Sequence, residues 1–208
     1  MEKYHKIQTV FKRDQNNRNK TLLDGEFSLP EFKYLKDNEW VFTEKVDGTN
    51  IRIKWDGESL SLGGKTDNAQ IPTGIVEFFN TMILPQKQLF GEIFDCPVCL
   101  YGEGYGPKIQ SGGNYRKDQS IVIFDIKIGD FWLFRDDVHE ISMKLGLDTV
   151  PIIGSGTLLT MVDIVREGFL SIWGNFIAEG IVARPAVEIK TRRGDRIITK
   201  IKYKDFVH

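Results

Sequence analysis

Three residues in this chain have the types and the setting for chemistry at a phosphate. Lys45 lies in "FTEKVDGTNIRI", Glu103 in "LYGEGYG" and Glu179 in "AEGIVAR", each within three residues of a glycine. A lysine amine is a nucleophile once it has lost its proton, and nearby cations such as Lys202 and Lys204 favour that loss. One or two carboxylates together with a phosphate hold hydrated Mg²⁺. Residue types alone do not combine these three into one site, and the setting of Lys45 equally describes a surface lysine before a turn.

The segment around Lys45 is expected to be a strand that ends in a turn. Residues 40–45 alternate between two faces, one of which holds Lys45. After the turn the alternation resumes in "TNIRIKW", and the Asp-Gly pair at 56–57 followed by "ESLSLG" predicts a hairpin. Lys45 is therefore expected at the end of one strand, just before this hairpin.

The rest of the chain mixes helical and strand patterns. Helical repeats cover residues 73–84 and 158–173, "SIVIFDIKI" is typical of a buried strand, and residues 186–206 predict a basic hairpin. Many hairpins and few regular crossovers predict an α+β fold. With 208 residues and 41% hydrophobic residues, one compact domain is expected over residues 1–208.

Charge is balanced in total but unevenly distributed. The formal net charge is −1, yet residues 188–204 contain seven basic residues and two acids. On charge alone, this run fits a solvated strand as well as a nucleic-acid contact. The three histidines are scattered, which argues against a histidine-based mechanism.

The sequence shows no targeting signal, and its two cysteines give little indication of a metal site. No apolar run is long enough to span a membrane and "MEKYHKIQTV" lacks a signal segment, so a cytoplasmic protein without membrane contact is expected. Cys96 and Cys99 form a lone C-x-x-C without the further ligands of a zinc site. Two reduced structural thiols are the favoured interpretation.

Five segments follow the order and approximate spacing of the nucleotidyltransferase motifs of covalent polynucleotide ligases. They are "EKVDGTN", "YGEGYGPKIQSGGNY", "IVIFDI", "AEGIVARP" and "IKYK", and the match spans residues 40–204. The chain most resembles the RNA ligase 2 branch, in which Thr-Asn follows the glycine of the first motif. This resemblance implies a ligase-type nucleotidyltransferase domain with mostly antiparallel sheets, flanking helices and a nucleotide pocket between the sheets. It also implies ATP as the AMP donor and Mg²⁺ or Mn²⁺ as the metal.

The resemblance assigns roles around the first motif. It makes Lys45 the nucleophile that becomes Lys-AMP as pyrophosphate leaves, and Asn50 a contact of the α-phosphate. Gly48 would let the backbone approach the nucleotide. Asp47 matches the wider superfamily, whereas some RNA ligase 2 members carry histidine there. Glu44 faces away from Lys45 along the strand, but the family places this position near adenine.

The later motifs bring acids and an aromatic ring. Glu92 in "LFGEIFD" and Glu103 both follow glycine; Glu92 lies in a helical pattern, and Glu103 is chosen as the acid that holds the ribose hydroxyls or a metal-bound water. By periodicity Phe124 is a core residue, while the resemblance makes it the ring that stacks on adenine. The resemblance makes Glu179 a ligand of the catalytic metal, with Glu103 beside it.

Cations at matched positions are expected to contact phosphates. Lys202 and Lys204 are the implied catalytic lysines of the last motif. Lys65 stands where many relatives carry arginine, and Arg184 replaces a lysine common in the branch. Both replacements keep the charge but change its geometry.

Such ligases usually carry a further domain after the last motif, whereas this sequence ends four residues after Lys204. An adenylyltransferase domain standing alone, as a monomer, is therefore expected. The basic hairpin and the N-terminal segment are the candidates for gripping nucleic acid, which would be RNA ends or a nicked RNA-containing duplex. The cations of that segment are Lys3, Lys6, Lys12, Arg13, Arg18 and Lys20.

The leading hypothesis is an ATP-dependent RNA ligase that acts in RNA repair or nick sealing. It would adenylate itself, transfer AMP to a 5′-phosphate and seal that end to a 3′-hydroxyl. The alternatives are a minimal ATP-dependent DNA ligase, a capping-type guanylyltransferase and a non-catalytic nucleic-acid-binding relic. The Thr-Asn pair favours the RNA ligase over the first two, and the retained lysines and acids argue against the third.

Overall fold

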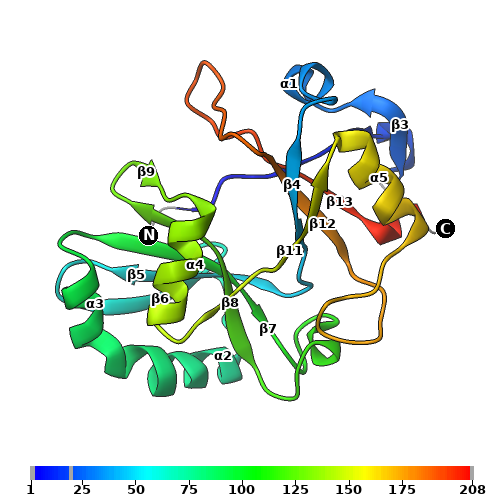
Figure 1. The fold of residues 1–208 in the computed structure, drawn as a ribbon. Helices are drawn as coiled ribbons and strands as arrows, with labels where there is room; N and C mark the ends of the chain where they lie inside the picture. Colours follow the sequence, from blue (N-terminus) through cyan, green and yellow to red (C-terminus); the bar gives the residue numbers. More distant parts are fainter. Residues whose placement is uncertain (1–2, 19–20, 207–208) are drawn as a thin grey trace. The chain divides into compact units, whose positions relative to one another are not determined.

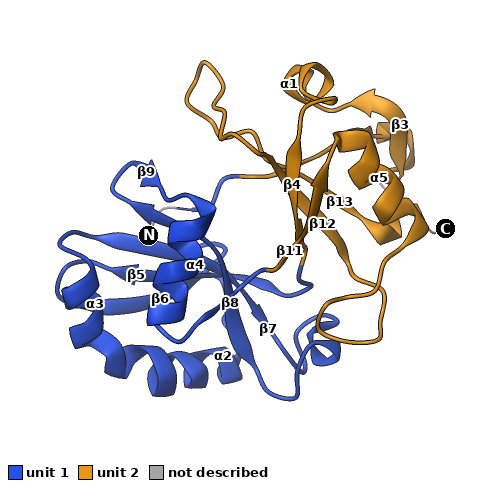
Figure 2. Cartoon of the chain, in the orientation of Figure 1, with its two compact units in different colours: residues 1–5, 46–150 blue, residues 6–45, 151–208 orange. Residues whose placement is uncertain are grey.

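A computed structural model describes residues 3–18 and 21–206, so Lys20 lies outside the described residues (Figure 1). The chain divides into two compact units, unit 1 with residues 1–5 and 46–150 and unit 2 with residues 6–45 and 151–208 (Figure 2). Each unit has its own sheet and its own hydrophobic core. The single domain expected over residues 1–208 stays a prediction.

Unit 1 contains a six-stranded sheet in the order β10-β8-β7-β5-β6, with β9 paired to β8. All its strand pairs are antiparallel except β10 with β8. The strands are β5 (Thr49–Trp55), β6 (Leu60–Gly64), β7 (Val98–Tyr105), β8 (Ser120–Ile128), β9 (Phe131–Trp132) and β10 (Asp148–Thr149). The helices are α2 (Thr73–Phe78), η2 (Phe79–Ile83), η3 (Leu84–Gln86), α3 (Lys87–Ile93), η4 (Gly112–Asn114) and α4 (Arg135–Lys144).

The core of unit 1 lies between one face of this sheet and helices α2, α3 and α4. Ile51 and Ile53 of β5 are buried there with Phe90 of α3 and Val138 of α4. Because side chains alternate along a strand, the residues between them on β5 point to the other face of the sheet. That second face carries the polar positions of unit 1.

Unit 2 contains a five-stranded sheet in the order β1-β13-β12-β4-β11, antiparallel except for β1 with β13, and the hairpin β2-β3. The strands are β1 (Gln8–Thr9), β2 (Phe11–Arg13), β3 (Leu22–Phe27), β4 (Trp40–Glu44), β11 (Ile152–Gly156), β12 (Gly180–Pro185) and β13 (Thr199–Lys202). The helices are η1 (Gln15–Asn17), α1 (Pro30–Tyr34), α5 (Leu158–Glu167) and η5 (Tyr203–Asp205). Helix α5 packs its buried residues, among them Met161 and Val165, into the core that Trp40 and Phe42 also enter.

Most predicted elements are confirmed, including the α+β class and the β5-β6 hairpin. Two helices differ from the prediction. The repeat over 73–84 is α-helical only to Phe78 and continues as a π turn and a 3₁₀ turn that contains Pro85. The helix expected over 158–173 ends at Glu167, because Gly168 has a φ of 81° that no right-handed helix accommodates. Residues 168–179 therefore form a loop.

Within the described residues, no helix combines the length and apolar character needed to cross a membrane.

Candidate functional site

The end of β4 positions Lys45 beside a buried strand face. Trp40 and Phe42 point into the core of unit 2, at 0% and 1% exposure. The alternation therefore directs Lys45 to the opposite face, as predicted from the sequence. The Lys45 backbone N–H donates to the Gly180 carbonyl over 2.9 Å, which joins this residue to the start of β12.

Lys45, Glu179 and Lys202 form an ion-pair cluster in unit 2, called the Lys45 cluster below. Lys45 Nζ lies 2.5 Å from Glu179 Oε2, and Lys202 Nζ lies 2.5 Å from Glu179 Oε1. The three side chains are 18%, 10% and 22% exposed, so their charges are less screened than those of surface pairs. One carboxylate thus holds two amines next to each other.

Backbone pairing brings these three segments together from distant parts of the sequence. Strand β12 lies between β4 and β13, with Gly180 opposite Lys202 and Ile181 opposite Glu44. The Tyr203 N–H donates to the Glu179 carbonyl over 2.9 Å. A Cβ on Gly180 would stand 2.1 Å from the Ile201 carbonyl oxygen, so only glycine permits this close pairing.

The other predicted cations of unit 2 are placed differently from one another. Arg184 and Lys200 lie on the same sheet face as Lys202, because they alternate in step with it on paired strands. Lys204 lies in η5 and is exposed, so the expectation that it continues the strand is wrong: β13 ends at Lys202. Lys204 therefore belongs to the helical turn η5 and not to the strand that carries Lys202.

The Glu44 side chain is buried and not exposed at the surface. Its side chain is 1% exposed, and its Oε2 accepts a hydrogen bond from the Ile172 backbone N–H over 2.9 Å. Burial raises the pKa of the Glu44 carboxyl, while hydrogen bonds from the Ser171 hydroxyl and the Ile172 N–H oppose that rise. Glu44 therefore anchors the loop 168–179 that leads to Glu179.

In unit 1, Asn50 and Glu103 are direct cross-strand neighbours on the polar face of the sheet. Their sequence neighbours Ile51 and Gly104 face the core, where a Cβ on Gly104 would meet Ile51. Glu92, the rejected alternative, is exposed on helix α3 and accepts a hydrogen bond from Gln88. The structure brings Glu103, and not Glu92, beside Asn50.

Arg52 is a residue of this face that the sequence analysis missed. It is fully buried, its Nε donates to the Gly64 carbonyl over 2.7 Å, and its Nη2 lies 3.0 Å from Asp67 Oδ1. The hydrogen bond from Arg52 lowers the pKa of the Asp67 carboxyl. Arg52 thereby ties β5 to the loop that starts at Lys65, which is exposed. The only sequence signal was an arginine in an otherwise alternating strand.

Phe124 occupies an irregular position on β8. The pairing of β7 with β8 shifts register between Tyr101 and Gly102, which leaves Phe124 without a paired Cα while Asp125 faces Tyr101. Phe124 is half-buried, so the core position that periodicity predicts is wrong. The bulge re-aims this ring, and a simple alternation cannot reveal such a shift.

Tyr4 completes an aromatic group around Phe124, and nothing in the N-terminal sequence pattern indicated it. The Tyr4 hydroxyl donates to Asp125 Oδ2, and its ring meets Phe124 edge-on at 5.0 Å between centroids. Trp132 of β9 also contacts the Tyr4 ring edge-on, at 5.5 Å between centroids. These contacts fix the bulge that carries Phe124.

Asp47 and Gly48 hold unit 1 segments close together. Asp47 Oδ2 accepts a hydrogen bond from the Ser111 N–H over 3.2 Å, and the Asp47 N–H donates to the Tyr115 hydroxyl over 3.1 Å. A Cβ on Gly48 would stand 2.3 Å from the Gly104 carbonyl oxygen. The close approach that requires Gly48 is therefore to strand β7.

A divalent metal at this site would take its protein ligands from acidic side chains. No group of three or more His, Cys, Asp or Glu side chains suited to a metal occurs among residues 3–18 and 21–206. Mg²⁺ commonly takes only one or two carboxylates and completes its shell with water and substrate phosphates. A single carboxylate such as Glu179 fits that requirement when phosphates are bound.

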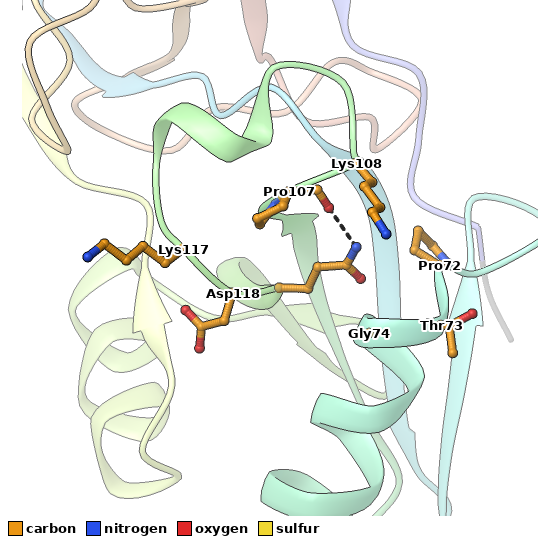
Figure 3. A pocket seen from close by; sticks show the side chains of 8 residues that line it. Pro72, Thr73, Gly74, Pro107, Lys108, Lys117 and Asp118 are labelled. Carbon is orange, nitrogen blue, oxygen red and sulfur yellow. Dashed lines mark hydrogen bonds between the residues drawn. The ribbon is translucent and has the colours of Figure 1, made fainter.

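A pocket in unit 1 is lined by residues other than the predicted site residues (Figure 3). Gln119 at its wall donates to the Pro107 carbonyl over 2.7 Å. Its lining is Pro72, Thr73, Gly74, Pro107, Lys108, Lys117, Asp118 and Gln119. None of these residues was predicted to bind nucleotide.

Comparison with known proteins identifies the family of this chain. The family model described as RNA ligase matches residues 38–203, so the chain belongs to the RNA ligase family. No curated protein matched the sequence.

The fold is similar to solved structures of an RNA ligase from Naegleria gruberi. A mutant without ligand matches with a TM-score of 0.66 and 15% identity over 96% of this chain and 56% of that chain. A mutant with ATP and Mn and the enzyme with pyrophosphate each match with a TM-score of 0.65 and 18% identity over 94% of this chain and 55% of theirs. This chain thus spans little more than half the length of those ligases, and the likeness confirms the expected ligase-type fold.

Proposed function

We propose that this chain is an ATP-dependent RNA ligase that works through a lysyl-AMP intermediate. The observation that carries the proposal is the Lys45 cluster, in which the lysine of the first motif shares one carboxylate with a second lysine. Membership of the RNA ligase family supports the reaction class. The solved relatives with ATP and Mn and with pyrophosphate support ATP as the donor.

The first step joins Lys45 to AMP. The Lys45 ammonium, which Glu179 holds, gives a proton to water, and the neutral Nζ then attacks the α-phosphorus of ATP. The N–P bond forms, the bond from the α-phosphorus to the bridging oxygen breaks, and pyrophosphate leaves. Lys202, on the same carboxylate, brings a positive charge that opposes the negative charge that builds on the phosphates.

Two further transfers would seal RNA. An oxygen of an RNA 5′-phosphate attacks the phosphorus of Lys45-AMP, which breaks the N–P bond and restores the lysine. A 3′-hydroxyl then attacks the 5′-phosphorus of the activated end and AMP leaves, so that a phosphodiester is formed. The substrate would be RNA ends or a nicked RNA-containing duplex, and the enzyme a monomer.

The remaining residues keep the roles that the motif resemblance implies. By that resemblance, Glu179 and Glu103 are the ligands expected for Mg²⁺ or Mn²⁺, which would neutralise phosphate charge. Asn50 would contact the α-phosphate, Glu103 the ribose, and Phe124 would stack on adenine. The other residues that the resemblance assigns to the nucleotide site are Glu44, Asp47, Gly48, Lys65, Arg184 and Lys204.

Sealing assays test this proposal against its alternatives. With ATP and Mg²⁺, a 3′-hydroxyl/5′-phosphate nick in an RNA duplex should be sealed faster than the same nick in an all-DNA duplex. Equal or faster sealing of DNA would instead identify a DNA ligase. A preference for GTP would favour a capping-type enzyme, and no nucleotidyl transfer at all would favour a relic.

A further inference from the structure

The basic run between β12 and β13 contains cations in two different settings. Arg196 is 8% exposed, and its Nε lies 2.5 Å from Glu188 Oε1. Lys190, whose backbone bridges to Arg196, is exposed, as are Arg192 and Arg193. The buried ion pair belongs to the stem of this hairpin, whereas the three exposed cations face solvent.

The tip of the hairpin is held in one conformation by its own hydrogen bonds. The Thr191 N–H donates to the Asp195 carbonyl over 2.8 Å, and the Gly194 N–H donates to the Thr191 carbonyl over 2.9 Å. The Thr191 hydroxyl oxygen accepts from the N–H groups of Arg193 and Asp195 over 3.3 and 3.2 Å. A pre-ordered loop loses less conformational entropy on binding a ligand than a flexible one.

The hairpin and the Lys45 cluster lie at opposite ends of β12. The cluster adjoins Gly180 at the start of the strand, and the hairpin begins after Pro185 at its end. Five residue steps in a strand correspond to about 17 Å. The hairpin projects past the end of β12 as the red-orange loop at the top of Figure 1. Its tip is therefore at least the length of β12 away from the Lys45 cluster.

Cations also occupy the sheet face between these two places. Lys202, Lys200 and Arg184 share the face of β12 and β13 that carries the cluster. Together with the tip they form a row of positive charge along one strand pair. Such a row complements a regularly charged polyanion better than a compact anion.

We infer that the hairpin tip, defined as Lys190, Arg192 and Arg193, binds phosphates of the RNA substrate at a distance from its reacting end. The guanidinium groups of Arg192 and Arg193 match phosphate oxygens in a two-pronged geometry. The contact adds affinity without sequence preference, because the phosphate backbone carries no base identity. This inference rests on the proposed RNA ligase function for the nature of the ligand.

The test is the affinity of the full chain, without ATP, for a fluorescently labelled nicked RNA duplex, measured by anisotropy over a series of salt concentrations. The double variant R192A/R193A should bind about tenfold more weakly near 0.1 M salt. The slope of its log Kd against log salt concentration should be smaller than that of the wild type by about 1.5. The variant R192K/R193K should keep most of the wild-type slope, because it keeps the charge.

The matched control is K33A/K87A, which removes two exposed lysines elsewhere in the chain. It should bind RNA like the wild type. An unchanged urea-unfolding curve of R192A/R193A would show that the variant is folded. Equal affinity and slope for R192A/R193A and the wild type, or an equal loss in K33A/K87A, would overturn the inference. Because the binding measurement uses no ATP, a failure of adenylation at Lys45 would contradict the proposed function and leave this result interpretable.

Discussion

At the scale of single residues, Lys202 and Lys204 share a residue type and stand two positions apart, yet they lie in different settings. Only Lys202 ends a strand and pairs with Glu179, while Lys204 is exposed on the following helical turn. Residue type and spacing predicted a pair of equivalent lysines. The difference depends on where β13 stops, which local periodicity does not define.

Substitution of Lys202 should therefore affect self-adenylation more than substitution of Lys204. Lys202→Ala removes a positive charge beside the nucleophile, and loss of one such group typically lowers kcat by about 10²–10³. Lys204→Ala serves as the matched control and should lower the rate less than tenfold. The measurement is the single-turnover rate of AMP transfer to the protein. Equal losses in both variants would contradict the special place of Lys202.

The buried carboxyl of Glu44 should make stability depend on pH. Burial raises its pKa above the ordinary 4.5, so the folded state holds the proton more tightly than the unfolded state. The resulting stabilisation is complete below the unfolded pKa and is lost as pH rises through the folded pKa. Glu44→Gln has no such loss, so its free energy of unfolding should rise relative to that of the wild type as pH rises.

Urea unfolding of both proteins at a series of pH values between 4 and 8 measures this difference. Glu77→Gln, at an exposed glutamate, controls for the loss of one carboxylate. A difference between Glu44→Gln and wild type that stays constant with pH, or that falls as pH rises, would contradict the role given to burial.

At the scale of elements, the strand alternations predicted more than the helical repeats did. The faces of β4 and β5 follow directly from the sequence, because buried apolar residues at every second position leave one arrangement. The bulge at Phe124 and the contact of Tyr4 with Asp125 depend on pairing between distant segments. Such pairing has no local signature, so these positions could not be predicted.

Strand β12 is the element on which the Lys45 cluster depends most. Gly180→Ala would place a methyl group against the Ile201 carbonyl and separate β12 from β13. We expect a loss of about 3 kcal/mol in the free energy of unfolding, together with loss of self-adenylation. Thermal and urea unfolding measure the first effect, and AMP transfer measures the second.

Gly91→Ala is the matched control, because no close contact at Gly91 requires a glycine. Gly91 lies in helix α3, where a Cβ would meet Trp55 at an ordinary 3.7 Å. This variant should be as stable as the wild type or more stable by about 0.5–1 kcal/mol, since alanine favours helices. Unchanged stability in Gly180→Ala would show that β12 and β13 do not need their close approach.

At the scale of the whole molecule, family and fold were accessible from the sequence because five short motifs kept their order over most of the chain. The family match over residues 38–203 confirms that resemblance, although the similar solved structures are only 15 to 18% identical. The division into two compact units was not predicted. It follows from how the chain returns: residues 151–208 complete the sheet that residues 6–45 begin, and no local pattern reports such a return.

The central claim is that Lys45 becomes covalently attached to AMP. The direct measurement is to incubate wild type and Lys45→Ala with Mg²⁺ and ATP labelled at the α-phosphate, and to map the modified peptide by mass spectrometry. We expect label on the wild type that is stable to alkali and released by acid or by acidic hydroxylamine, with AMP on Lys45, and no label on Lys45→Ala. Label that persists in Lys45→Ala, or a wild type that ATP does not label, would contradict it.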